Sequence, residues 1–293
     1  NYEREGLLVA EAPDDNGRLA GFAACFVLNK PIEKVGHRED TGFISMFGVV
    51  PAAAVASQPG VMPEWGDREK AVGEALLSAA EGFFRTRGRR LIVISPYTPN
   101  YFVPGVDKDR YAPLLRFLEG AGFREYSEAL AADALIARFE IPAEVVEKER
   151  ALAAEGIEIR HYRREDLASY LQFQRDLMPG PWIEDTRYYL LEMAAGRFPE
   201  DAIWLAVDHR RDGRIIGFCM HDREHFGPFG VSDEYQGRGI GSVLLARTLE
   251  RMRMRGCHSA WVLWTGERAL KGVYGRLGFT LTRRFAILKK ELA

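Results

Sequence analysis

A strand, a glycine-rich turn and an amphipathic helix follow one another directly between His225 and Gly256, and this run constrains the fold more than any other part of the chain. The strand reads HFGPFGV, the turn QGRGIG and the helix SVLLARTLERMRM. Leu245, Leu249 and Met252 recur at helical spacing, which predicts a helix with one buried face. Gly256 is expected to end that helix.

The turn itself has the composition of an anion-binding site. Gly237, Gly239 and Gly241 carry no side chains where backbone N–H groups must approach a ligand closely. The partial positive charge of the following helix start, roughly half a charge, favours a phosphate or pyrophosphate. Arg238 can add charge-assisted hydrogen bonds. The spacing fits neither the dinucleotide fingerprint G-x-G-x-x-G nor a P-loop, which needs G-K-[ST].

The order Gln236-x-x-Gly239-x-Gly241 resembles motif A, Q/R-x-x-G-x-G/A, of the GNAT superfamily of N-acetyltransferases. A glycine-rich helix start used only for packing is the alternative interpretation of these six residues. The resemblance implies that acetyl-CoA is the co-substrate and that its pyrophosphate lies on this turn. The cofactor-binding residues that it implies are Phe229, Gly230, Val231, Gln236, Gly237, Arg238, Gly239, Ile240, Gly241 and Ser242.

A second motif follows in the expected order. The apolar run 258–264 predicts a strand, residues 267–277 predict a helix, and Gly278-Phe279 closes it. This segment resembles the Y-x-x-x-G-F ending of motif B, which implies that Tyr274 protonates the departing CoA thiolate. A buried core tyrosine is the alternative. Glu267 departs from the pattern, because many relatives carry an asparagine there.

Two residues are candidates for the general base. Glu224 and His225 precede the strand at which the sheet is expected to splay, and either could remove a proton through a water molecule. A solvated turn acid and a surface histidine are the alternatives. His221 and His225 do not converge at this spacing in a non-helical stretch, so we predict no metal site.

Composition excludes several classes of protein. A length of 293 residues suggests about two domains, and a net charge of −2 without a basic run gives no case for nucleic acid. No stretch approaches the roughly 20 apolar residues that span a membrane. Cys25, Cys219 and Cys257 lie in apolar runs, which predicts buried thiols in a reducing, cytoplasmic setting. The chain begins with Asn1 rather than Met, which leaves open whether native residues precede it; the oligomeric state is not indicated.

The first half of the chain contains a second copy of the same pattern. REKAVGEALL, from Arg68, aligns with QGRGIGSVLL, from Gln236, and in both copies the helix is followed by a glycine 20 residues on (88 − 68 and 256 − 236). Gly122-Phe123 likewise matches Gly278-Phe279. We therefore predict two tandem GNAT-like domains.

The first copy departs from the motifs where binding and catalysis are expected. Glu69 and Ala71 replace the glycines of the turn, and a carboxylate there repels pyrophosphate unless it points to solvent. Leu118 stands in the place of Tyr274, so no phenol is present. We expect this domain to be structural, or to bind CoA weakly without turnover.

The predicted fold class is α/β (α+β), with each domain a mixed, mostly antiparallel, splayed sheet flanked by helices. The predicted domains are residues 1–143, a helical linker at 144–155 and the catalytic domain at 156–293. Only one long strand, 280–291, follows Gly278, where this fold usually has a pair. We therefore expect a strand at 134–141 to complete the sheet of the second domain.

The function predicted from the resemblance is acetyl-CoA-dependent transfer of an acetyl group to a primary amine by direct attack in the C-terminal domain. The tandem organisation is similar to that of mycothiol synthases, which favours a small-molecule amine; an aminoglycoside-like antibiotic, a polyamine or a protein N-terminus are alternatives. Glu184, Asp185 and Glu224 would suit a cationic acceptor. The alternatives from other classes are a non-catalytic acyl-CoA-binding or sensor protein and a structural interaction protein, the latter fitting the first domain better.

Overall fold

The computed structural model describes residues 3–12, 17–29, 38–51, 60–95, 102–178 and 182–292. The chain forms two compact units, one of Asn1–Leu130 with Arg283–Ala293 and the other of Ala131–Thr282. Two strands, β6 (Arg124–Leu135) and β12 (Thr280–Glu291), contribute residues to both units.

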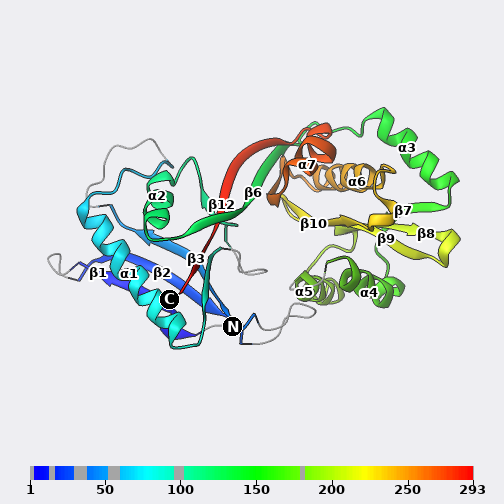
Figure 1. The fold of residues 1–293 in the computed structure, drawn as a ribbon. Helices are drawn as coiled ribbons and strands as arrows, with labels where there is room; N and C mark the ends of the chain where they lie inside the picture. The colour runs from blue at the N-terminus through cyan, green and yellow to red at the C-terminus, as the bar shows by residue number, and fades with distance from the viewer. Residues whose placement is uncertain are drawn as a thin grey trace. The chain divides into compact units, whose positions relative to one another are not determined.

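The first unit is a sheet with the strand order β1-β2-β3-β4-β12-β6. Neighbouring strands from β1 to β3 are antiparallel, whereas β3 and β4 are parallel. Helix α1 packs along this sheet (Figure 1). Its elements are β1 (Leu7–Glu11), β2 (Leu19–Val27), β3 (Thr41–Val49), α1 (Asp67–Arg85), β4 (Leu91–Ile94), β5 (Val106–Asp107) and α2 (Ala112–Gly120).

The second unit has the strand order β6-β11-β10-β9-β8-β7. Strands β7 to β10 are antiparallel neighbours, and β10 runs parallel to β11. Helices α3 and α6 lie on one face of the sheet and α4 and α5 on the other (Figure 1). Its elements are α3 (Ala143–Ala154), β7 (Ile157–His161), α4 (Leu167–Leu177), α5 (Trp182–Ala194), β8 (Ile203–Asp208), β9 (Arg214–Asp222), β10 (His225–Val231), α6 (Ile240–Met254), β11 (Ser259–Thr265) and α7 (Glu267–Ala269).

The fold class agrees with the prediction: the structure is a mixed α/β fold whose mostly antiparallel open sheet is flanked by helices. The predicted helix at 267–277 is less regular than expected. Its middle, Leu270–Tyr274, is a π-helical turn in which Gly272 has a non-helical ψ of −107°. Proline and glycine signals in the sequence also predict turns or loops at 13–17, 51–65, 97–110 and 178–182, and these segments lie partly outside the described residues.

The two units do not divide the chain where the sequence predicted. The predicted linker, 144–155, is helix α3, whose Val145 and Leu152 are buried in the core of the second unit. Ala132 and Ala134 of β6 are buried in the same core, so the division falls near residue 130 rather than 143. Hydrophobic burial, which turn signals in the sequence do not reveal, sets these boundaries.

Strand exchange accounts for the single strand after Gly278. Strand β6 lies beside β11, as expected for a strand that completes the second sheet, but it ends at Leu135 and not at residue 141. The reverse exchange was not predicted: the last part of β12 pairs with β4, with Leu288 opposite Ile94. Ala286 and Leu288, near the C-terminal end of the chain, thus belong to the core of the first unit.

Candidate active site

The glycine turn leaves the N-terminus of helix α6 open. Gly237 and Gly239 have φ angles of 79° and 87°, in the left-handed region where a side chain is strained. Gly239 is the N-cap residue, and no side chain caps the helix. The first N–H groups of a helix have no partner within it, so this end suits an anion.

The residues predicted on the turn are brought together as one structure. The Gln236 side-chain amide donates to Asp233 Oδ1 over 2.7 Å, which braces the turn from the preceding residues. Ile240 is buried, so its side chain anchors the helix in the core while its backbone faces the turn. The N–H of Ser242 donates to the Gly239 carbonyl over 3.1 Å and closes the first turn of the helix.

Two side chains crowd the glycines. A Cβ on Gly241 would lie 3.1 Å from the ring of Phe229. A Cβ on Gly239 would lie 2.8 Å from Cγ of Lys148, a residue of α3. Sequence reasoning missed Lys148, because nothing in the segment predicted as a linker indicates that it crosses the turn. An anion on this turn would have a lysine beside it.

Arg238 is already engaged by protein groups. Its guanidinium pairs with the carboxylate of Glu155 and lies 5.3 Å from the ring centroid of Tyr235. Tyr235 is itself fixed by its hydroxyl, which donates to Asp208 over 2.7 Å. A phosphate that contacts Arg238, as predicted, therefore competes with Glu155 for the guanidinium.

Strand β10 separates from β11 beyond its first residue. The two strands pair only at His225 and Trp261. On its other side, β10 keeps register with β9 except for a shift between Phe226 and Phe229, where the Gly227–Pro228 peptide bond is cis. The separation predicted for this strand is thus present, with Phe229, Gly230 and Val231 beyond the last paired residue.

Tyr274 lies against the same strand. It is 7% exposed, and its ring centroid is 5.4 Å from that of Phe226 and 6.2 Å from that of Phe229. Burial raises the pKa of the Tyr274 hydroxyl, although the Thr265 side chain opposes the shift. The ring of Phe229 therefore lies between Gly241 of the glycine turn and the ring of Tyr274, so the residues of the two motifs lie near each other.

The acidic residues predicted on the acceptor side do not form one group. Glu184 is exposed and pairs with Arg187 over 2.5 Å. Glu224 lies in the β9–β10 turn, where its carbonyl accepts the Trp261 N–H over 2.9 Å. Asp185 is half-buried, and this burial, with the nearby charge of Glu184, raises its pKa to about 6.

A second set of polar side chains lies beside the start of β10. The Tyr189 hydroxyl is 3.4 Å from Asp222 Oδ2. Burial is the largest influence on Tyr189 and raises its pKa to about 12, and the charges of Asp222 and Asp185 act in the same direction. His225 stacks on Trp261 with ring centroids 4.3 Å apart, and burial lowers its pKa. Sequence reasoning missed Tyr189 and Asp222 because their proximity is purely tertiary.

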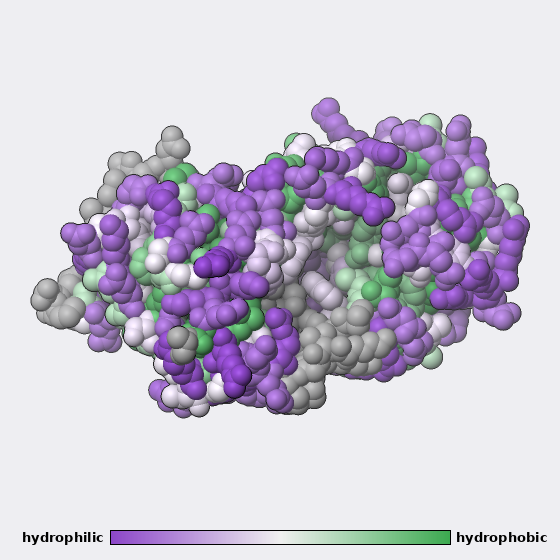
Figure 2. Space-filling view, in the orientation of Figure 1, coloured by the Kyte–Doolittle hydropathy of each residue, from purple (hydrophilic) through white to green (hydrophobic). Residues whose placement is uncertain are grey.

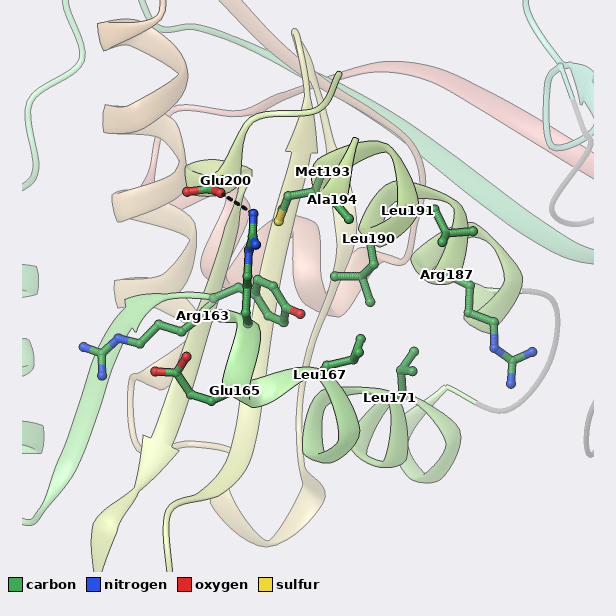
Figure 3. A pocket seen from close by; sticks show the side chains of 12 residues that line it. Arg163, Glu165, Leu167, Leu171, Arg187, Leu190, Leu191, Met193, Ala194 and Glu200 are labelled. Carbon is green, nitrogen blue, oxygen red and sulfur yellow. Dashed lines mark ion pairs between the residues drawn. The ribbon is translucent and has the colours of Figure 1, made fainter. Parts of the chain in front are cut away.

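A cavity of about 770 Å³ lies elsewhere in this unit, between the start of α4 and the end of α5. Figure 3 shows Leu167, Leu171 and Leu190 lining it. Arg164, which also lines the cavity, pairs with Glu200 over 3.7 Å. No residue of β10, β11 or α6 lines this cavity. It is therefore not the space into which the two motifs point.

Figure 2 shows hydrophilic side chains over most of the visible face of α3, and a hydrophobic area between α6 and the α4–α5 pair.

In the part of the chain that the structure describes, no helix is long and apolar enough to cross a bilayer. The described residues also contain no group of three or more His, Cys, Asp or Glu side chains placed to hold a metal ion.

The geometry of the turn and of Tyr274 agrees with the comparison with known families. Residues 167–279 match the family model described as the acetyltransferase (GNAT) family. These residues form a GNAT domain. The matched segment begins with α4 and ends at Phe279, so it contains both motifs.

Solved structures similar to this chain extend the likeness beyond the GNAT domain. A GCN5-related N-acetyltransferase from Sphaerobacter thermophilus matches 98% of this chain and 81% of its own, with a TM-score of 0.67 and 18% identity. A tandem GNAT protein from the clavulanic acid biosynthesis pathway matches 95% of this chain and 81% of its own, with a TM-score of 0.56 and 14% identity. At these identities the likeness is one of fold, and it covers both units.

A third similar structure is a fungal multi-domain GH3 β-N-acetylglucosaminidase, described as containing a GCN5-related glucosamine N-acetyltransferase region. It matches 94% of this chain with a TM-score of 0.72 and 19% identity, but this chain spans only 32% of that protein.

In the first copy of the fold, the residues that correspond to the glycine turn are part of helix α1 and form no turn. The repeat aligns Ala71 with Gly239, yet α1 begins at Asp67, so the residues that correspond to the turn are helical. Glu69 is buried and accepts the Gly66 N–H over 3.0 Å. Its carboxylate therefore does not point to solvent; it occupies the end of the helix at which an anionic ligand would bind.

Proposed function

We propose that this chain transfers the acetyl group of acetyl-CoA to the primary amine of a small molecule at the separation between β10 and β11. The observation that carries the proposal is the uncapped N-terminus of α6, with Gly237 and Gly239 in the left-handed region, facing the same strand as the buried phenol of Tyr274. In this proposal the pyrophosphate lies on the turn and the thioester lies along Phe229, Gly230 and Val231.

The reaction requires no covalent enzyme intermediate. The amine nitrogen attacks the thioester carbonyl, a C–N bond forms, and the C–S bond breaks as the tetrahedral intermediate collapses. Backbone N–H groups of β10 stabilise the developing oxyanion. Tyr274 donates its proton to the departing thiolate, which a phenol with a raised pKa can do because it stays protonated at neutral pH.

The proton lost by the amine requires an acceptor near the start of β10. Glu224, one of the two candidate bases predicted from the sequence, lies in the turn before this strand, and His225, the other candidate, is the first residue of the strand. We add Asp185 as a candidate, because a carboxyl with a pKa of about 6 is matched to proton transfer near neutral pH. Asp185 and Asp222 would also attract a cationic amine.

The first experiment is steady-state release of CoA thiol from acetyl-CoA with glucosamine, spermidine and an aminoglycoside as acceptors. Glucosamine is included because one similar structure is described as acting on it. Tight acetyl-CoA binding without turnover of any amine would favour the non-catalytic acyl-CoA-binding alternative.

Tyr274→Phe tests the acid. We expect kcat to fall about 10²–10⁴-fold with an unchanged Kd for acetyl-CoA, since the ring is retained and only the proton is lost. Tyr170→Phe is the matched control: it also removes a buried hydroxyl, one bonded to Gln174 over 2.9 Å, from a different core cluster. Equal effects of the two variants on kcat would refute the assignment.

A further inference from the structure

The first unit contains a small cavity that no motif assigns. Its volume is about 250 Å³, below the usual range of about 300–1,000 Å³ for drug-sized ligands, so it suits a molecule of few heavy atoms. It lies where β3 and β4 stop pairing, at Ile44 opposite Ile94. Leu118, which replaces the catalytic tyrosine of the GNAT domain, forms part of its wall.

Three buried polar side chains line this cavity with atoms that have no partner in the described part of the chain. Ser45 is 4% exposed, Ser95 1% and Asp107 3%. The hydroxyls of both serines and Oδ2 of Asp107 make no hydrogen bond within the described residues. A buried polar atom without a partner is costly, and a carboxylate oxygen especially so, which points to a ligand that supplies donors.

Asp107 is held in a fixed orientation. Its Oδ1 accepts the N–H groups of Asp109 and Arg110 over 3.1 and 3.0 Å. These bonds fix the carboxylate by one oxygen and leave Oδ2 for the cavity. An ammonium group would satisfy both the charge and the geometry of that oxygen.

A cation lies on the same face of the neighbouring strand. Asp107 is opposite Phe285 in the antiparallel pairing of β5 with β12, so the two side chains share a face. Arg283 is two residues from Phe285 and therefore shares it too, and all three line the cavity. Diagonal neighbours of this kind lie roughly 7–8 Å apart, a separation that a small zwitterion can bridge.

The remaining wall is apolar. Phe22, Phe47 and Leu114 line it together with Leu118. Acidic and basic groups on one face, two hydroxyls and an apolar wall together match one class of small molecule: an ammonium, a carboxylate and a hydrocarbon side chain.

We infer that this cavity of the first unit binds a free amino acid with an apolar side chain, its ammonium on Asp107 and its carboxylate on Arg283. The unit then serves as a ligand-binding module without CoA, since Glu69 already occupies the helix end that would hold pyrophosphate. The role does not depend on acetyl transfer by the GNAT domain.

The test is calorimetry of the full chain with L-leucine in the absence of acetyl-CoA. Two probes of the same skeleton serve as controls: 4-methylpentanoate, which lacks the ammonium, and 3-methylbutylamine, which lacks the carboxylate. We expect one site for L-leucine. Each control compound should bind at least about ten-fold more weakly, because each loses a charged hydrogen bond. Absence of binding for L-leucine, L-methionine and L-phenylalanine at millimolar concentration would overturn the inference.

Two variants locate the site. Asp107→Asn keeps the Oδ1 acceptor and should abolish the preference for L-leucine over 4-methylpentanoate; Arg283→Gln should abolish the preference over 3-methylbutylamine. Arg284→Gln is the matched control. Arg284 is next to Arg283 in β12, so its side chain lies on the opposite face of the strand, and it pairs with Glu128 over 3.0 Å. Unchanged preferences in both Asp107→Asn and Arg283→Gln would place any leucine binding elsewhere and overturn the assignment.

Discussion

Replacing each glycine of the turn by alanine separates backbone strain from crowding. Gly237 and Gly239 have similar φ angles, 79° and 87°, so a Cβ costs about 1–2 kcal/mol of conformational strain at either position. The surroundings differ: a Cβ on Gly237 meets nothing within 4 Å, whereas one on Gly239 lies 2.8 Å from Cγ of Lys148. Gly239→Ala must therefore also displace the lysine.

We expect Gly237→Ala to lower the free energy of unfolding by about 1–2 kcal/mol, and Gly239→Ala to lower it further. Lys148→Ala should recover the additional loss in Gly239→Ala and leave the loss in Gly237→Ala unchanged. Contacting residues commonly show a coupling of about 0.5–3 kcal/mol in such a double-mutant cycle. Both glycine variants should also weaken acetyl-CoA binding, because both alter the N–H groups of the turn.

Urea denaturation gives the stabilities and calorimetry the affinity for acetyl-CoA. Gly82→Ala in α1 is a control of opposite sign, since this glycine is helical with nothing within 4 Å of an added Cβ. Replacing Gly82 by alanine should raise the free energy of unfolding by about 0.5–1 kcal/mol. Equal losses in Gly237→Ala and Gly239→Ala, with no coupling to Lys148, would refute the reasoning about the lysine.

Three further perturbations test other parts of the structure. Glu155→Gln removes the carboxylate that competes for Arg238 and should tighten acetyl-CoA binding by up to about five-fold in calorimetry, as for other partly exposed ion pairs; weaker binding would show that Glu155 positions the arginine instead. The pKa of Asp185, about 6, lies above its ordinary value of 3.8, so the folded chain holds this proton more tightly, and stability should fall as pH rises from about 4 to 6. Asp185→Asn should remove that part of the slope in denaturation measured across pH, and an unchanged slope would contradict the assignment. Leu118→Ala, at a fully buried site of the first unit, should cost about 2–5 kcal/mol in denaturation while leaving the affinity for acetyl-CoA unchanged; an altered affinity would contradict the proposal that acetyl-CoA binds in the second unit alone.

The elements of the GNAT domain were predictable because local signals agree with one another there. The alternation in residues 157–161 predicts β7, and the helical spacing of apolar residues after Gly239 predicts α6. The turn between β10 and α6 was predictable for a chemical reason, since only glycine tolerates the left-handed region without strain. Internal repetition then extended the same interpretation to α1 of the first unit.

The partners of the turn were not predictable, because they come from a helix whose sequence signal is weak. Helix α3 buries only Val145 and Leu152, and its many charges are typical of a solvated linker. Yet Glu149 of this helix accepts two hydrogen bonds from Arg247 of α6, at 3.1 and 2.6 Å. This pairing joins α3 to α6 one residue from Lys148, and single-sequence patterns carry no information about pairing between helices.

The exchanged strands illustrate the same limit at a larger scale. A long strand can be predicted over residues 280–291, but its pairing with β4 depends on which sheet has an edge available. Both sheets have such an edge, because only one long strand follows the Gly-Phe pair in each copy, namely β6 after Phe123 and β12 after Phe279. Each of these two strands contributes residues to both units, so each sheet gains a second strand from the other copy.

The N-termini of the two corresponding helices, α1 in the first unit and α6 in the GNAT domain, differ in whether they hold a carboxylate. This difference gives a physical reason why two copies of one fold can differ in their affinity for anions. In the first unit the Glu69 carboxylate, which was predicted to repel pyrophosphate, accepts the Gly66 N–H and stabilises the start of helix α1. In the GNAT domain no side chain caps α6, so the corresponding free energy remains available to a ligand. A helix end that already holds carboxylates gains stability from them and loses affinity for other anions. The first turn of α6 holds no acidic residue, so on this argument acetyl-CoA should bind at the start of α6 and not at the start of α1.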